Sequence, residues 1–268
     1  MKIEYRIAIN PDIIQQKILN DLGVINPEGT GFFVFKLEEH SEAFMKLKPY
    51  LDKWGVLCMA ESTFSKVELD NSTLLQVNCM WINGYPQPEN DFEYRKTTYS
   101  ESDYCSSCGM GLIQKAPFRL LKSPNWGTKS MFQLNWINDE IFVSKSIYDE
   151  VFKRFGVLFK SVELHKKNII IEDTLQLLIP ETTVSLNLEG FPFEICKKCE
   201  RKKYNPQIKG YFPSLNETEK SHIFRTKEYF GSGHVAFQKI LISQELRQAI
   251  MKYKGKLDYI PCTAHSQK

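Results

Sequence analysis

The sequence lacks long apolar runs. No stretch approaches the roughly 18 consecutive apolar residues that a membrane-spanning helix needs. The first ten residues, MKIEYRIAIN, contain no unbroken apolar segment typical of a secretory signal peptide. We therefore expect a cytoplasmic protein without a membrane partner. In a reducing compartment its seven cysteines are expected to be thiols or metal ligands rather than disulfides.

The sequence also lacks the short motifs of common catalytic classes. There is no G-x-S-x-G, no H-E-x-x-H and no Walker loop. The segment GSGH at 231–234 is rich in glycine but has no Lys-Ser/Thr ending, so we expect a hairpin turn there. The acidic pairs Asp139-Glu140 and Glu172-Asp173 are interpreted as solvated turns between strands. These absences favour a protein that is not an enzyme.

A large excess of charge of one sign is absent as well. The chain has 35 Lys and Arg against 32 Asp and Glu, a formal net charge of +3 that is too small to indicate a nucleic-acid partner. With 268 residues, of which 42% are hydrophobic, it is long enough to bury a core without covalent cross-links. This length suits one large domain or two small ones.

The first part of the chain alternates strand and helix patterns, which is typical of an α+β fold. Residues 2–9 alternate between apolar and polar side chains and predict a strand. Residues 41–54 predict a helix, with Ser41 as N-cap and Gly55 as its stop. A further strand is predicted at 64–69.

The polar run NGYPQPEN at 83–90 is dense in turn-forming residues. It is the best candidate for a domain boundary, with the break near residue 95. The sequence thus predicts an N-terminal α+β domain over 1–95 and a second domain over 96–268.

The second domain contains a candidate repeat. Segment 142–162 aligns without a gap to segment 241–261, so that Ser144 matches Ser243 and Gly156 matches Gly255. Each copy reads as a strand, a Ser N-cap, a helix, a Gly stop and a second strand. Two interpretations remain open, because this punctuation is common: a true duplication, or a chance similarity of two ordinary strand–helix–strand units.

Each copy is preceded by a C-x-x-C pair, Cys105/Cys108 in YCSSCGMG and Cys196/Cys199 in ICKKCERKK. A duplication would therefore span about 105–164 and 196–262. Four thiolates are what one tetrahedral structural Zn²⁺ takes, so these four residues are the predicted ligands of one zinc ion per chain. Gly109 supplies a positive φ after the first pair, whereas Glu200 stands at that place in the second.

Other assignments of the cysteines and histidines stay open at this point. A thioredoxin-like redox motif is one alternative, although it needs a C-x-x-C at a helix N-terminus after a strand. His222 or His234 is a candidate replacement ligand. Cys58 and Cys79 lie in apolar runs and are predicted to be core residues, and Cys262 is a bystander.

The strongest charge feature is a basic cluster interleaved with Tyr204, Tyr211 and Phe212, which consists of Lys197, Lys198, Arg201, Lys202, Lys203 and Lys209. It predicts either a nucleic-acid contact through phosphates and stacking or a solvated loop around an anionic metal centre. The aromatic run 117–136 includes Trp126. Core packing is the first explanation of this run, and a partner-binding patch is the second.

The pattern of two separated C-x-x-C pairs, the first written Cys105-x-x-Cys108-Gly109 and each followed by a strand–helix–strand unit, resembles the bacterial double-CXXCG motif proteins. The resemblance covers about residues 96–268 and departs from the family at Glu200. Members of that family occur among immunity proteins of toxin–immunity loci. The resemblance implies a non-enzymatic protein that neutralises a cognate toxin by binding it.

Together these observations predict an α+β fold with mixed sheets, a few helices and two similar strand–helix–strand units joined by a pair of zinc knuckles. The expected function is that of a cytoplasmic, zinc-stabilised immunity protein with a toxin as its protein partner. The alternatives are a nucleic-acid-binding zinc module that uses loop 197–209, and a thiol oxidoreductase. The weaker predicted contact residues for a partner are the basic residues 197, 198 and 201–203 together with Trp126.

Overall fold

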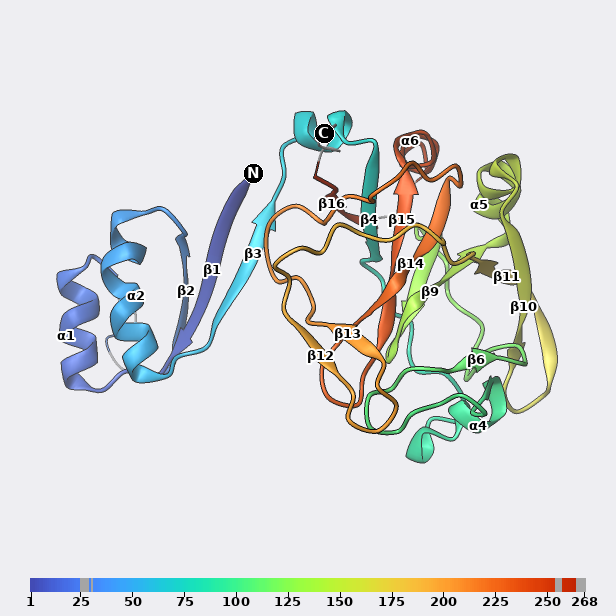
Figure 1. Cartoon of the computed structure of the whole chain (residues 1–268), viewed down its shortest axis with the longest axis horizontal. Coiled ribbons are helices and arrows are strands. Elements are labelled where there is room, and N and C mark those ends of the chain that lie inside the picture. The colour runs from blue at the N-terminus through green and yellow to red at the C-terminus, as the bar shows by residue number, and fades with distance from the viewer. Residues whose placement is uncertain (25–28, 30, 254–256, 264–268) are drawn as a thin grey trace. The chain divides into compact units, whose positions relative to one another are not determined.

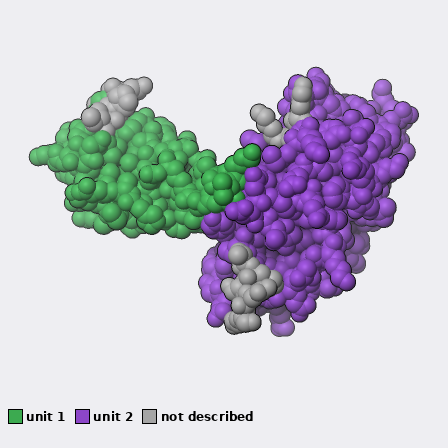
Figure 2. Space-filling view, turned by 90° about the horizontal axis from the view of Figure 1, so that it is seen from above, with its two compact units in different colours: residues 1–68, 207–210 green, residues 69–206, 211–268 purple. Residues whose placement is uncertain are grey.

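The computed structural model describes residues 1–24, 29, 31–253 and 257–263 (Figure 1). The chain forms two compact units (Figure 2). The smaller unit comprises residues 1–68 with 207–210, and the larger comprises 69–206 with 211–268. Among the described residues, none of the helices is long and apolar enough to cross a membrane.

The smaller unit is an antiparallel sheet covered on one face by two helices (Figure 1). Its strands run in the order β2-β1-β3. The elements in chain order are β1 (Lys2–Ile9), α1 (Ile13–Asp21), β2 (Phe33–Glu38), α2 (Glu42–Trp54) and β3 (Cys58–Thr63). Ile7 and Ile9 of β1 are buried together with Phe44, Leu47 and Leu51 of α2, so one face of this helix covers the sheet.

The predicted helix over 41–54 is confirmed with both of its ends. The hydroxyl of Ser41 accepts a hydrogen bond from the N–H of Phe44 at 3.2 Å, and Gly55 ends α2 with φ of 66°. The strand predicted at 64–69 is wrong, because α3 (Lys66–Asn71) lies there. Ser65 and Glu68 form reciprocal backbone caps three residues apart, and this pattern of a helix N-terminus outweighs the local alternation.

The larger unit contains two mixed sheets and a small hairpin, in agreement with the predicted α+β class. One sheet has the strand order β7-β10-β11-β9-β8, the other has the order β12-β13-β14-β15-β4-β16, and β5 pairs with β6. The predicted boundary near residue 95 falls inside this unit. The reason is that β4 (Leu74–Cys79) is an internal strand of the six-stranded sheet, paired with β15 and β16.

The remaining elements of the larger unit are, in chain order, η1 (Asn90–Phe92), α4 (Tyr94–Thr98), β5 (Tyr99–Ser100), β6 (Ile113–Gln114), β7 (Arg119–Leu120), β8 (Met131–Leu134), β9 (Ile137–Ser144), α5 (Lys145–Glu150), η2 (Phe152–Phe155), β10 (Leu158–Leu164), β11 (Ile169–Leu178), β12 (Phe193–Ile195), β13 (Lys202–Tyr204), β14 (Ile223–Phe230), β15 (Phe237–Ser243), α6 (Gln244–Met251) and β16 (Leu257–Pro261). The predicted turn at 231–234 connects β14 to β15, so this hairpin is confirmed.

Two strand–helix–strand units repeat in the larger unit. The first is β9–α5–β10 and the second is β15–α6–β16. Ser144 caps α5 by accepting from the N–H of Ile147, and Ser243 caps α6 by accepting from the N–H of Leu246. Gly156 adopts the expected left-handed conformation, while Gly255 lies outside the described residues.

The sheet registers extend the repeat beyond these units. In the first sheet Leu175 and Gln176 of β11 lie opposite Val143 and Phe142 of β9. In the second sheet Leu75 and Gln76 of β4 lie opposite Ile242 and Leu241 of β15. The same Leu-Gln pair therefore occupies the same register in both sheets, which makes β4 the structural equivalent of β11.

This equivalence means that the larger unit consists of two intertwined halves. We name them the first half, β4 to β10, and the second half, β11 to β16. The first strand of each half is inserted into the sheet of the other: β4 lies between β15 and β16, and β11 lies between β9 and β10. The main core lies between the two sheets and combines buried side chains from both halves, such as Leu75, Val143, Leu177 and Ile242.

We predict that removing either equivalent helix cap destabilises the larger unit. Ser144→Ala and Ser243→Ala are each expected to lower the free energy of unfolding by about 1 kcal/mol, because a helix N-terminal N–H loses its acceptor. Urea denaturation measures this. The exposed Ser123→Ala is the control and is expected to change stability by less than about 0.5 kcal/mol. Equal stability of all three variants would show that neither cap stabilises the unit, and a loss in only one cap variant would contradict the equivalence of the caps.

Candidate metal centre

The structure brings the four predicted cysteine ligands together. The Sγ atoms of Cys105, Cys108, Cys196 and Cys199 all lie within 4.8 Å of one another. The Sγ of Cys105 is 3.7 Å from that of Cys196, and the Sγ of Cys108 is 3.6 Å from that of Cys199. A tetrahedral ion with metal–sulfur bonds of about 2.3 Å spaces its sulfurs about 3.8 Å apart. The cluster therefore has the size and composition of a four-thiolate metal site.

The two cysteine turns have the same backbone construction, one in each half. The N–H of Cys105 donates to the carbonyl of Met110 at 2.8 Å, and the N–H of Cys196 donates to that of Arg201 at 3.0 Å. Each turn lies between two short antiparallel strands, β5 and β6 for the first and β12 and β13 for the second. These hairpins orient both sulfurs of each pair toward the other half.

The residue after each second cysteine has a left-handed backbone. Gly109 has φ of 83° and Glu200 has φ of 59°, and the N–H of each donates at 2.8 Å to the carbonyl of the first cysteine of its turn. A Cβ at Gly109 would lie 2.4 Å from the carbonyl oxygen of His234. Glu200 is exposed, so its side chain reaches solvent. This explains why a non-glycine residue is accepted in the second turn and excluded from the first.

Two cations lie directly beside the cysteines. The Nε of Arg201 donates to the Sγ of Cys199 at 3.3 Å, while its two terminal nitrogens donate to the side chain and carbonyl of Asp103. Lys203 is only 2% exposed, and its Nζ donates to the carbonyls of Cys108, Gly233 and Val235. A divalent ion with four thiolates carries two net negative charges, which these two cations balance.

The environment divides the thiols into two kinds. The guanidinium of Arg201 lowers the pKa of Cys199 to about 6, so this thiol is ionised at neutral pH without help. Burial raises the pKa of Cys108 to about 12, so this thiol gives up its proton only to a bound cation. Metal affinity is therefore expected to fall as the pH falls, because protons compete for the sulfurs.

The other cysteines and the two candidate histidines lie outside the cluster. Cys79 and Cys262 are buried, and Cys58 is half-buried in the smaller unit. His234 lies beside the first turn, where its Nδ1 is 2.9 Å from the carbonyl oxygen of Ser106. His222 contacts Ser243 and is not part of the cluster.

The predicted basic cluster does not stay together as one exposed surface. Lys203 and Arg201 are held by the cysteine turns as described above. Lys209 belongs to the smaller unit, where its Nζ pairs with Glu39. Lys197, Lys198 and Lys202 remain exposed. Of the basic residues at 197–209, these three are the exposed ones near the second turn that form no ion pair within the described part of the chain.

Trp126 is half-buried, and its indole packs edge-on against Trp81 with ring centroids 5.5 Å apart. It also contacts the buried Phe132 of β8. These contacts favour the core-packing explanation of the aromatic run. The tryptophan that sequence reasoning did not single out is Trp136, which is 43% exposed at the β8–β9 turn.

The interpretation of the acidic pairs as turns is wrong. Asp139 and Glu140 lie within β9, and Glu140 is only 5% exposed. Glu172 and Asp173 lie within β11, although they do face solvent. Glu140 tolerates burial because Arg225 pairs with it at 3.0 Å, and this partner lies 85 residues away in the sequence. The pairing of Glu140 with Arg225 could therefore not be predicted from the neighbouring sequence.

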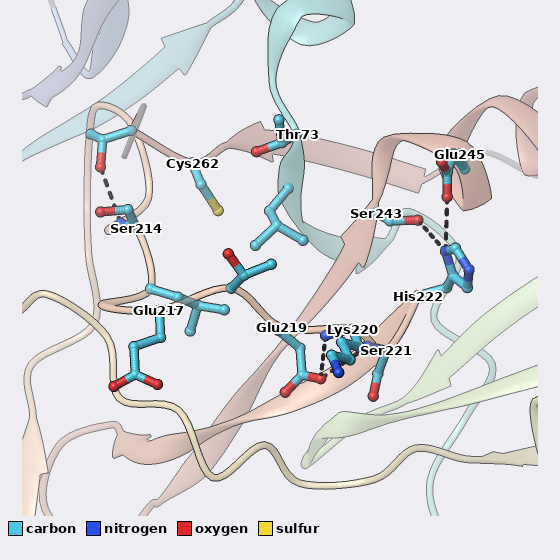
Figure 3. A pocket seen from close by; sticks show the side chains of 14 residues that line it. Thr73, Ser214, Glu217, Glu219, Lys220, Ser221, His222, Ser243, Glu245 and Cys262 are labelled. Atoms are coloured by element: carbon cyan, nitrogen blue, oxygen red, sulfur yellow. Dashed lines mark hydrogen bonds and ion pairs between the residues drawn. The ribbon is translucent and has the colours of Figure 1, made fainter. Parts of the chain in front are cut away.

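A second site with chemically interesting residues lies at the start of α6 (Figure 3). The Nδ1 of His222 lies 2.9 Å from the Oγ of Ser243 and 3.2 Å from a carboxylate oxygen of Glu245. A Ser–His–acid triad uses both ring nitrogens, one for each partner. Here both contacts use the same nitrogen, and Ser243 also caps α6. The arrangement fastens a helix end and does not activate the serine.

We predict opposite tolerance at the two left-handed positions. Gly109→Ala is expected to cost about 2–3 kcal/mol, because the new Cβ collides with the β14–β15 turn in a strained backbone region. Glu200→Gly is expected to stay within about 1 kcal/mol of the wild type, since relief of strain offsets the greater chain entropy of glycine. Urea denaturation of the metal-loaded protein measures both. A costly Glu200→Gly would show that the two turns are not built alike.

No model of a known protein family matches this chain, and no curated protein matches it either. The proposed function therefore rests on the geometry of the chain's own residues and on the resemblance of its two C-x-x-C pairs to the double-CXXCG motif proteins.

Proposed function

We propose that this chain is a non-enzymatic, zinc-stabilised binding protein that neutralises a cognate bacterial toxin by direct contact. The observation that carries the proposal is the closed cluster of four thiols, which joins the two intertwined halves. A site with four protein ligands leaves no coordination position for a substrate, so its contribution is structural. Function then belongs to the surfaces that the cluster holds in place.

Zinc is the proposed ion because of the ligand chemistry. Four thiolates in a tetrahedral arrangement select Zn²⁺ or iron, and isolated structural sites of this kind in cytoplasmic proteins use Zn²⁺. Each close sulfur pair joins the two turns, Cys105 to Cys196 and Cys108 to Cys199. A redox C-x-x-C pair would instead approach within one turn, so the geometry favours a metal ion over a thiol oxidoreductase.

A candidate binding surface lies beside the second cysteine turn. Strand β12 forms the edge of its sheet, and Phe193 and Ile195 are both about half exposed on it. The Nζ of Lys202 lies 3.9 Å from the centre of the Phe193 ring. We call the set Phe193, Ile195, Lys197, Lys198 and Lys202 the β12 patch. An apolar centre with a basic rim suits a protein partner whose contact surface is acidic.

The β12 patch also includes the residues that the nucleic-acid alternative would use. Only Lys197, Lys198 and Lys202 remain in loop 197–209 once Arg201 and Lys203 are assigned to the candidate metal centre and Lys209 to its ion pair with Glu39. Three phosphate contacts give weak, strongly salt-sensitive binding, because affinity for nucleic acid scales with the number of neutralised phosphates. A protein partner uses the exposed aromatic and aliphatic side chains as well, so it accounts for more of the patch.

The first test concerns the metal. Protein purified without chelator is expected to contain about one zinc per chain by elemental analysis. Cys105→Ser should lose most of it and should loosen the larger unit, because structural zinc contributes on the order of 10 kcal/mol to folding. Cys58→Ala is the control and should keep the full metal content, since Cys58 lies in the smaller unit. Metal-free protein with a disulfide between Cys105 and Cys108 would overturn the assignment.

The second test concerns the partner. The proposal expects a toxin gene beside this gene, and cells that express that toxin should survive when the wild-type chain is co-expressed. Phe193→Ala and the double change Lys197→Glu with Lys198→Glu should each weaken binding to that toxin by about tenfold or more, because central aromatic and complementary charged contacts are lost. Surface plasmon resonance with the purified pair measures the affinity.

A matched control uses a second pair of adjacent exposed lysines. Lys166→Glu with Lys167→Glu makes the same charge change in the β10–β11 turn and should leave affinity unchanged. Killing that continues in the presence of the wild-type chain would reject toxin neutralisation. Retention of the wild type on a DNA or RNA column at low salt, lost in the Lys197/Lys198 variant, would favour the nucleic-acid alternative instead.

A further inference from the structure

A large cavity lies in the larger unit, and it is separate from the site in Figure 3. Its volume is about 940 Å³, and its walls come from both intertwined halves. Strands β9 and β11 line one part, β14 and β15 line another, and the first cysteine turn contributes Gly109 and Gly111. Small-molecule sites typically measure about 300–1,000 Å³. The cavity is large enough for a drug-sized molecule.

The cavity contains a connected network of buried polar side chains. Glu140 accepts from the guanidinium of Arg225 at 3.0 Å and from the amide of Gln176 at 2.9 Å. Gln176 in turn exchanges hydrogen bonds with Gln114, which accepts from Lys160 at 3.0 Å. Burial raises the pKa of Glu140 to about 7, although Arg225 opposes the shift. Perturbed carboxylates in a cavity are characteristic of binding and active sites.

Other charges of both signs line the same cavity outside any direct ion pair among the described residues. Asp139 and Glu181 form no ion pair among the described residues; Asp139 accepts from the N–H of Gln238, and Glu181 accepts from its side-chain amide. Arg95 also has no carboxylate partner in the described chain, and its buried Nε has no acceptor. Three acidic and three basic side chains thus leave the walls close to neutral, with unpaired charges of each sign.

Aromatic side chains form another part of the wall. Trp136 contacts Phe92 with ring centroids 4.6 Å apart and Tyr94 at 5.9 Å. Its backbone has φ of 68°, a strained conformation for a large side chain and one that concentrates at functional sites. The guanidinium of Arg95 lies 4.7 Å from the centre of the Phe92 ring and donates to the hydroxyl of Tyr104. The wall therefore combines a fixed cation with flat apolar surfaces.

From these features we infer that the cavity binds a small zwitterion with an apolar body, of the amino-acid type, whose ammonium group is received by Asp139 and whose carboxylate is received by Arg95. A nearly neutral cavity whose walls carry carboxylates and a guanidinium outside any ion pair stabilises a ligand that carries both opposite charges. The aromatic wall packs against the body of the ligand. This site shares no residue with the β12 patch, and it adjoins the first cysteine turn through Gly109 and Gly111.

The test uses three probes with the same phenyl body. L-Phenylalanine carries both charges, 2-phenylethylamine carries only the ammonium group, and 3-phenylpropionate carries only the carboxylate. Titration calorimetry on the full, metal-loaded wild type is expected to give an affinity for L-phenylalanine about tenfold or more above that for either analogue, since each loses one charged hydrogen bond. Equal or weaker binding of L-phenylalanine, or no binding of any probe, would overturn the inference.

Two variants assign the charges. Asp139→Asn is expected to abolish the preference for L-phenylalanine over 3-phenylpropionate, while Arg95→Gln should abolish its preference over 2-phenylethylamine. Each variant should keep the other preference, which a general loss of folding would not produce. Glu217→Gln in the cavity of Figure 3 is the matched control and should retain wild-type affinities. A variant that changes both preferences equally, with intact metal content, would refute the assigned roles.

Discussion

The exchange of β4 and β11 between the two halves is the constraint on which the larger unit depends. Each strand fills the gap between the two strands that flank a helix of the other half, and each pairs antiparallel on both sides. Without β4, strands β15 and β16 would have facing edges with unpaired backbone groups, which is costly in a buried sheet. Neither half can therefore complete its own sheet, and the core between the sheets forms only when both are present.

The cysteine cluster likewise forms only when both halves are present. Each half contributes one turn with two sulfurs, which is half of a tetrahedral site, and the counter-charges come mainly from the second half through Arg201 and Lys203. A metal ion there ties β5–β6 to β12–β13, which otherwise pair in separate sheets. This arrangement explains why the basic residues of 197–209 do not form one surface. Arg201 and Lys203 lie beside the cysteines and balance their negative charge, whereas Lys197, Lys198 and Lys202 stay exposed.

The helix ends and the candidate metal site could be predicted from the sequence, because each is marked by residues that lie close together in the chain. Ser41 and Gly55 mark helix ends by their own backbone preferences, and the two C-x-x-C pairs mark a candidate metal site by residue type and spacing. The strand exchange was not accessible, because the Leu-Gln pairs of β4 and β11 acquire meaning only through their partners in the sheets. The prediction that Glu140 lies in a solvated turn was wrong for the same reason. An acidic residue is expected in solvent unless its distant partner, here Arg225, is known.

The structural equivalence of the two halves also locates where they differ. The sheet registers place Arg225 of the second half in the position that Gln133 has in the first, and Gln133 there only satisfies the backbone of Cys79 and Asn138. The sequence alignment places Lys239 opposite the position of Glu140. The cavity thus pairs Glu140 with Arg225, whereas the equivalent location holds Gln133 and Lys239. Burial of a carboxylate costs free energy even when a guanidinium pairs with it, so this difference opposes stability. A bound ligand of the proposed kind, whose charges contact the walls of the cavity, offsets that cost.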